Sequence, residues 1–270
     1  MNRSFLWTAL AVTLGSVLVT SPAFANLQVF PTRVILNDQK KAAHLSLRHM
    51  GDTPEKYRIM AVFYRMTPDG GMQLVKDASE PESAVKLLRF SPREVMLAPR
   101  MEQVLRVMFH SPKPVEEGEY RAHLLFEPTS EAPAADTNAG GKVKTQLTAK
   151  LAIAVPIIYR KGKPKISVSL SDLKLTRVGD NKPAFSITVN QEGRRFLFGD
   201  LQAHFTPEGG TSQLVGLVNG FSSYIPKRSA TYALAVPEGL SLQRGTLRVD
   251  CKEAPDEGGQ ILATTEVRIP

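Results

Sequence analysis

The stretch from Gln146 to Tyr159 reads QLTAKLAIAVPIIY, and its pattern decides the fold assignment. Residues two apart in a β-strand point to the same face. One face of this stretch therefore carries an apolar set: Leu147, Ala149, Leu151, Ile153 and Val155. We expect one long strand over 146–159. Because Pro156 lacks the N–H that a central strand donates, the strand is expected at a sheet edge or a bulge.

Short alternating runs closed by Pro, Gly, Asn or Asp recur along the whole chain, and helical periodicity is nearly absent. In the first half they predict strands at 27–36, 42–48, 56–65, 93–98, 102–109 and 119–127. In the second half they predict strands at 165–175, 184–190, 199–206, 213–218, 230–236, 245–251 and 260–268. The expected fold class is all-β, with two immunoglobulin-like β-sandwich domains.

Two composition changes divide the chain. Residues 128–145 are small and polar, which predicts a mobile loop inside the first domain, because the 146–159 strand needs partners that precede the loop. The run RKGKP at 160–164 contains Gly and Pro and is the expected hinge. An N-terminal domain over 26–160 and a C-terminal domain over 161–270 follow.

The first 25 residues have the features of a secretory signal peptide. Arg3 precedes an apolar run from Phe5 to Val19, and the small-residue site Ala23-Phe24-Ala25 follows. Cleavage near Ala25 would leave 245 residues and lower the net charge from +8 to +7. No second apolar run approaches the ~20 residues that span a bilayer, so stable membrane insertion is not expected.

The charge and the single cysteine limit the partners and the chemistry. A dispersed positive charge on an exported protein favours acidic protein partners or an anionic membrane surface rather than nucleic acid. Cys251 cannot form an internal disulfide, and its place in an alternating run predicts a half-buried apolar residue.

Motifs for catalysis are missing from the sequence, which contains no GxSxG, no HExxH and no phosphate-binding glycine loop. His44 and His123 lie on two strands that could be neighbours, but one histidine per strand is more often structural than a metal ligand. We expect no metal, no cofactor and no enzymatic activity. A carbohydrate-active enzyme would need aromatic platforms, and the only tryptophan is Trp7 in the leader.

The 146–159 strand suggests a binding function. It can be read as an ordinary core strand, but a long apolar edge strand is an aggregation hazard unless it pairs with another chain. We therefore interpret it as a strand that adds to the sheet of a partner. A secreted structural or adhesive surface protein made of β-sandwiches is the alternative.

Four segments resemble periplasmic chaperones that assemble pili and fimbriae in the chaperone–usher pathway (PapD-like). In chain order they are FPTRVIL at 30–36, LRFSPR at 88–93, GEYRAHLLF at 118–126 and AVPIIYR at 154–160. The third and fourth are most similar to the archaic branch. The resemblance implies a periplasmic chaperone with two immunoglobulin-like domains in a boomerang. Its donor strand would lend Leu147, Ala149, Leu151, Ile153 and Val155 to an incomplete pilin, which an outer-membrane usher then accepts.

The same resemblance implies an anchor for the terminal carboxylate of the pilin. The better-known branch uses an arginine on the first strand and a lysine late in the last strand of this domain. Arg33 matches the arginine, but Pro156 occupies the position of the lysine. An arginine can bind a carboxylate through two parallel hydrogen bonds, so Arg89 and Arg121 are the expected replacements.

Overall fold

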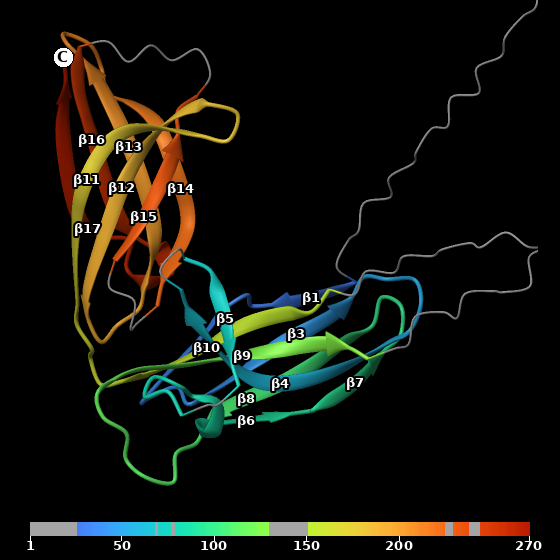
Figure 1. Cartoon of the computed structure of the whole chain (residues 1–270). Helices are drawn as coiled ribbons and strands as arrows, with labels where there is room; N and C mark the ends of the chain where they lie inside the picture. Colours follow the sequence, from blue (N-terminus) through green and yellow to red (C-terminus); the bar gives the residue numbers. More distant parts are fainter. Residues whose placement is uncertain (1–25, 68–69, 77–78, 130–150, 225–228, 238–243) are drawn as a thin grey trace, which may run out of the picture.

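The computed structural model describes residues 26–67, 70–76, 79–129, 151–224, 229–237 and 244–270. Within these residues the chain consists of β-strands and two 3-10 helices, η1 (Val85–Leu87) and η2 (Pro255–Glu257). The strands form two bodies that meet at an angle (Figure 1). The predicted all-β class is therefore confirmed. No helix in the described ranges is long and apolar enough to cross a membrane.

The N-terminal body contains two packed sheets. Its strands in the described residues are β1 (Leu27–Phe30), β2 (Val34–Asn37), β3 (Ala42–His49), β4 (Glu55–Met66), β5 (Met72–Val75), β6 (Leu88–Ser91), β7 (Glu94–Leu97), β8 (Glu102–Phe109), β9 (Gly118–Pro128) and β10 (Ile153–Lys161). One sheet has the order β1-β3-β8-β6. The other has the order β2-β10-β9-β4, and both β5 and β7 pair with β4.

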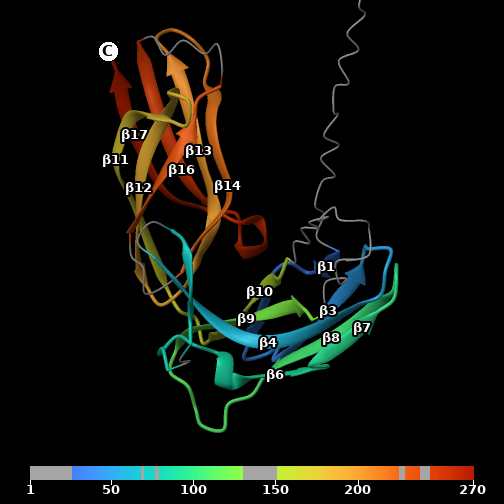
Figure 2. The ribbon, with the colours of Figure 1, turned by 45° about the vertical axis from the view of Figure 1, so that its right-hand side comes forward.

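The two sheets enclose a core of alternating apolar side chains. Leu45 and Leu105 face inward from the first sheet, and Leu124 and Phe126 face inward from the second; all four are fully buried. Burying such side chains is the main favourable term in folding. The sheet that contains β9 and β10 faces the C-terminal body, whereas β6 and β8 lie on the far side (Figure 2).

The prediction of a single strand at 27–36 is wrong, because the structure contains two strands there, β1 and β2. β1 pairs with β3 in the first sheet, and β2 pairs in parallel with β10 in the second. Pro31 lies between them and has no N–H to continue the first ladder. β5 and β6, which have four residues each, match none of the predicted strands.

In the part of the C-terminal body that the structure describes, seven strands correspond to those expected in the second half. They are β11 (Ile166–Val178), β12 (Lys182–Gly193), β13 (Leu197–Pro207), β14 (Gln213–Ser223), β15 (Ser229–Ala235), β16 (Gly245–Glu253) and β17 (Ile261–Ile269). Their sheets have the orders β11-β12-β15 and β14-β13-β16-β17. Cys251 is fully buried in this core, and burial raises its pKa to about 12. It is thus more deeply buried than expected.

Several predictions from the sequence lie outside the described residues. These are the signal peptide at 1–25 and, apart from Pro128 and Thr129, the loop at 128–145. Residues 146–150 of the expected 146–159 strand are outside as well.

Within the described residues the 146–159 strand was expected to include Leu151 and Ala152, but it begins at Ile153 and continues to Lys161. Arg160 and Lys161, which the sequence placed in the expected hinge at 160–164, belong to β10 and pair with β9. The described chain between Lys161 and the start of β11 at Ile166 belongs to neither pair of sheets.

Candidate functional site

Strand β10 is paired on one side along its whole length and on the other side only in part. It pairs antiparallel with β9 from Ile153 to Lys161. The parallel pairing with β2 begins only at Ile157 and ends at Arg160. The residues Ile153–Pro156 therefore have no strand on their outer side among the described residues. This open edge presents backbone N–H and C=O groups that another strand could use.

The position of Pro156 fits this half-open arrangement. The sequence predicts an edge or a bulge for a strand that contains proline, but β10 lies between β2 and β9 over its second half. Pro156 is the last residue before pairing with β2 begins. A proline is tolerated there because no neighbour on the outer side requires its missing N–H.

The predicted donor residues have different environments. Leu147 and Ala149 lie outside the described residues. Leu151 precedes β10 and is 52% exposed. Ile153 is half-buried against the N-terminal core, and Val155 is 3% exposed within that core. The structure therefore leaves Leu151 accessible to a partner, but it uses Val155 to fill the chain's own domain.

The opposite face of β10 borders a cleft between the two bodies. The cleft has a volume of about 560 Å³ and is lined from the N-terminal body by Met66, His123, Ala154 and Pro156. Phe221, Tyr224 and Tyr232 line it from the C-terminal body. The face of the sheet that contains Pro156 thus borders a space large enough for several side chains of a partner.

Arg121 lies behind this cleft and is enclosed. Its side chain is fully buried, and its guanidinium carbon is 3.8 Å from the centre of the Tyr224 ring. Nη2 donates to the carbonyl oxygen of Tyr64 at 2.7 Å, while Nε and Nη1 have no partner in the described structure. Burial lowers the pKa of Arg121 to about 10, which still leaves it charged at neutral pH. The centres of the Phe63 and Phe196 rings lie 5.1 and 5.6 Å from the same guanidinium carbon, so a carboxylate cannot reach Arg121 in this arrangement.

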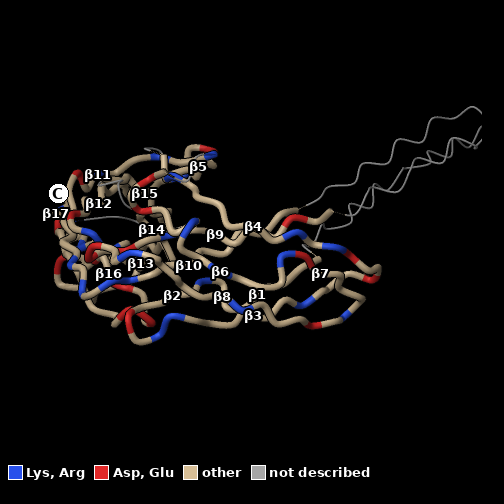
Figure 3. Tube along the Cα trace, turned by 90° about the horizontal axis from the view of Figure 1, so that it is seen from below, with Lys and Arg blue, Asp and Glu red and all other residues tan. Residues whose placement is uncertain are grey.

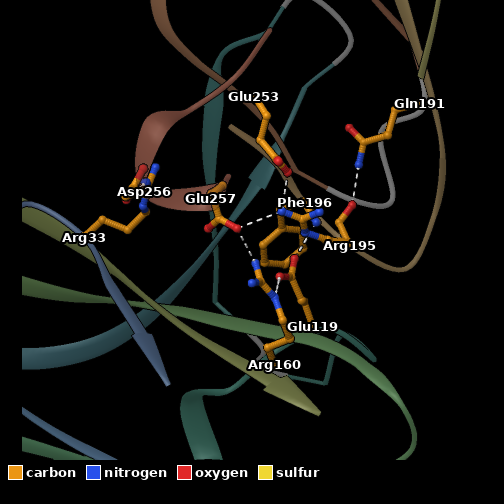
Figure 4. A network of polar contacts seen from close by, with 9 residues as sticks. All are labelled: Arg33, Glu119, Arg160, Gln191, Arg195, Phe196, Glu253, Asp256 and Glu257. Carbon is orange, nitrogen blue, oxygen red and sulfur yellow. Dashed lines mark hydrogen bonds and ion pairs between the residues drawn. The ribbon is translucent and has the colours of Figure 1, made fainter. Parts of the chain in front are cut away.

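Arg33 connects the two bodies from the other side of the same aromatic cluster. Its guanidinium lies over the Phe198 ring, 4.0 Å from the centroid, and forms an ion pair with Asp256 (Figure 4). Phe198 in turn contacts Tyr224, with 5.7 Å between ring centroids. Arg33 also borders a hollow of about 280 Å³ that Lys40 and His44 line. It keeps 22% of its side chain exposed, unlike Arg121.

Arg89 lies in a different sheet from the one that contains Arg121 and β10. It is exposed on β6, in the sheet opposite β10, and donates to the carbonyl oxygens of Lys86 and Leu88 at 3.0 Å. The structure therefore brings Arg33 and Arg121 to one aromatic cluster but leaves Arg89 on another face. His44 and His123 are separated in the same way, since β3 and β9 belong to different sheets. Within the described residues no group of three or more His, Cys, Asp or Glu is placed to hold a metal ion.

A chain of alternating charges joins the two bodies, and the sequence analysis did not identify it. Glu119 on β9 accepts from Arg160 Nε at 2.5 Å, and its other oxygen accepts from the backbone N–H of Phe196 (Figure 4). Arg160 also donates to Glu257 at 3.0 Å. Glu257 accepts from Arg195 at 2.8 Å, and Arg195 is also paired with Glu253. The signal that could have revealed it is Glu119 itself, an acid at the start of a strand whose following residues are buried.

Burial disfavours the charged form of Glu119 at this junction. The Glu119 side chain has no exposed surface, and burial raises its pKa, although Arg160 and the Phe196 N–H act in the opposite direction. A buried carboxylate is stable only when its hydrogen bonds are satisfied. The position of the C-terminal body is thus coupled to the end of β10, because Arg160 is the second-to-last residue of that strand.

No protein-family model and no curated protein matches the chain. Similar solved structures are fimbrial chaperones. The class 5 fimbriae chaperone CfaA is 13% identical over 91% of this chain and 100% of its own, with a TM-score of 0.47. The CupB2 chaperone of Pseudomonas aeruginosa is 12% identical over 90% and 100%, with a TM-score of 0.44.

A third similar structure is the CsuC–CsuE chaperone–tip adhesion subunit complex from archaic chaperone–usher Csu pili of Acinetobacter baumannii. The matched chain is 13% identical over 77% of this chain and 90% of its own, with a TM-score of 0.40. At these identities and TM-scores, the likeness is one of overall architecture alone.

Removing the cation beside Glu119 should destabilise the junction. Arg160→Met leaves the buried carboxylate without its charged partner, and we expect the free energy of unfolding to fall by about 3–5 kcal/mol. Arg58→Met is the matched control, because Arg58 is exposed and its ion pair with Glu94 spans 3.8 Å, so it should cost at most about 1 kcal/mol. Urea unfolding followed by circular dichroism measures both. Equal losses in the two variants would contradict the structural role of the pair.

The buried His123 should make stability depend on pH. Burial, with Arg121 nearby, lowers the His123 pKa from 6.5 to about 3. The unfolded chain therefore takes up a proton that the folded chain refuses, so stability is complete above pH 6.5 and falls as pH decreases towards 3. Between pH 7 and pH 5 the loss should be about 1–2 kcal/mol.

His123→Phe should remove this part of the pH dependence while keeping a ring against Tyr64, whose centroid is 5.1 Å away. Urea unfolding at pH 7 and pH 5 on both proteins isolates the contribution of His123, since other groups titrate alike in the two. An unchanged slope in the variant would show that His123 is not the group responsible.

Proposed function

We propose that the chain is a periplasmic chaperone that binds pilus or fimbrial subunits by donor-strand complementation and delivers them to an outer-membrane usher. The open edge of β10 at Ile153–Pro156 carries this proposal. An edge of this kind offers main-chain hydrogen bonds to an incoming sheet, and its alternating side chains offer specificity. The motif series in the sequence supports the same function.

The donor segment is proposed to comprise Leu147, Ala149 and Leu151, with Ile153 at its end. Leu151 is 52% exposed, and a large apolar side chain next to an unpaired backbone edge is suited to enter another protein's core. Val155 is better understood as the residue that fixes the strand to its own domain, since its side chain is 3% exposed. The segment up to Ile153 would then pack into the core of the subunit, and the segment from Val155 onward would pack into the core of the chain's own N-terminal body.

Arg33 is the proposed anchor for the terminal carboxylate of the subunit. It is partly exposed, whereas Arg121 is covered by Tyr224 and Arg89 lies on the opposite sheet. Asp256 occupies the guanidinium of Arg33 and is itself 62% exposed, so an incoming carboxylate could replace it. Arg121 is proposed instead to hold Tyr224 in place through its cation–π contact.

Export and delivery rest on the sequence. The leader at 1–25 supports a periplasmic location, and delivery to an usher is supported by the resemblance of the four segments. A non-enzymatic role agrees with the lack of catalytic motifs in the sequence.

Charge on the donor segment should abolish subunit binding. With Leu151→Asp, the subunit would have to bury an unpaired carboxylate, so recovery of pilus subunits with the tagged chaperone from the periplasm should fall about 100-fold or more. Leu217→Asp is the control, since Leu217 is 47% exposed on β14 of the C-terminal body. Quantitative mass spectrometry of the co-purified subunits measures the ratio. Equal recovery with both variants would refute the donor assignment.

Substitutions of Arg33 and of Asp256, which form one ion pair, should have opposite effects on subunit binding. Arg33→Gln should weaken subunit binding about tenfold or more, because a buried carboxylate loses a charged donor. Asp256→Asn should leave binding intact or strengthen it, because it releases Arg33. Competition of the variants for a limited amount of subunit compares them directly. If both substitutions weaken binding equally, Arg33 acts by joining the two bodies and not as an anchor.

A further inference from the structure

The outward face of the β1-β3-β8-β6 sheet forms a second surface, on the side of the N-terminal body away from the cleft. Strand register places its residues in rows. One row contains Phe30, Ser46 and Val104 on β1, β3 and β8. We call this face the outer face. It is distinct from the open edge of β10, which belongs to the other sheet.

The outer face exposes large apolar side chains where a solvated sheet would carry polar ones. Phe30 is 71% exposed, Val104 is 52% exposed, and Met108 is 37% exposed. Met108 has β3 on one side and β6 on the other, whereas Val104 is paired with Ser46 of β3 and lies beyond the end of the pairing with β6. Apolar side chains gathered on one face are typical of an interaction surface.

Arginines lie in the rows on both sides of the row that contains Phe30, Ser46 and Val104. Arg48 lies opposite Glu102 in one adjacent row, and Arg106 lies opposite His44 in the other. Arg89 is paired with Met108 in the next row. Glu102 accepts a hydrogen bond from Ser46 at 2.5 Å, and no ion pair is found for these three arginines among the described residues. Figure 3 shows the sheet from below, with cationic positions along β3, β6 and β8.

We propose that the outer face binds an acidic protein surface, one that presents carboxylates on both sides of an apolar patch. Arginine is enriched at protein interfaces because its planar guanidinium pairs with carboxylates through two hydrogen bonds. Among the described residues the face carries three arginines and the single glutamate Glu102, so a second copy docked through it would bring two net-positive faces together. Charge complementarity thus favours an acidic partner over self-association.

The dimensions of the outer face fit a partner of the transient class. The two central strands, β3 and β8, have eight residues each. At ~3.4 Å per residue and ~4.8 Å between strands, four strands present a flat area on the order of 500 Å². Because the outer face and the β10 edge belong to opposite sheets, both can be occupied at once. The inference does not depend on what β10 binds.

Site-specific photo-crosslinking in the full-length chain tests the proposal. We would place a crosslinking residue with Val104→p-benzoylphenylalanine, express the protein in its own bacterium, irradiate whole cells and identify the adducts by mass spectrometry. The control is Leu217→p-benzoylphenylalanine, at a similarly exposed apolar position of the C-terminal body. We expect a protein adduct at Val104 that maps to an acidic surface of the partner and is missing at Leu217.

Charge reversal decides whether the arginines bind the partner. Arg48→Glu combined with Arg106→Glu should lower the adduct yield about tenfold or more, and lysines in place of the mapped carboxylates of the partner should restore it. Reversal of Lys165, Lys174 and Arg177, exposed cations of the C-terminal body, should leave the yield unchanged. Circular dichroism verifies that the reversed chains are folded.

Other outcomes would overturn the proposal. These are a lack of protein adducts at Val104, an adduct with a second copy of this chain, or a yield that charge reversal does not change. Flotation with vesicles of phosphatidylglycerol and phosphatidylethanolamine tests the competing occupant. If the chain binds these vesicles and Arg48→Glu with Arg106→Glu abolishes that binding, the outer face contacts lipid and the protein partner is refuted.

Discussion

The buried carboxylate of Glu119 is the constraint on which the arrangement of the two bodies depends. One of its oxygens is bonded to Arg160 on the neighbouring strand, and the other is bonded to the Phe196 backbone in the C-terminal body. A carboxylate without exposed surface cannot exchange these bonds for water at low cost. The rotation of one body against the other is therefore restricted by the need to keep both bonds.

An apolar cluster gives the same junction its packing. Ile158, Phe196, Phe198 and Tyr224 form this cluster between the two bodies. Arg33 and Arg121 lie over rings of the cluster from two sides. Stacked guanidinium groups keep their charge while they pack like flat apolar groups. The junction can therefore contain several arginines without one acidic partner for each of them.

The sequence predicted the strands well where alternation extends over seven residues or more. It missed the break at Pro31, although the buried positions shift from Leu27 and Val29 in β1 to Val34 and Leu36 in β2, which belong to different sheets. It grouped Val155, which is 3% exposed in the chain's own core, with the donor residues, since alternation cannot distinguish between the chain's own core and that of a partner. The charges that join the two bodies, from Glu119 to Glu253, are far apart in sequence and no local pattern connects them.

Strand β10, which contains Pro156, extends without a break from the open edge to the junction between the two bodies. Ile153 and Arg160 belong to the same strand, and a β-strand hardly lengthens under load because its backbone is already near full extension. A pull along the axis at one end is thus passed to the other. A partner that binds the open edge at Ile153 and pulls on it would therefore also displace Arg160, the residue that pairs with Glu119.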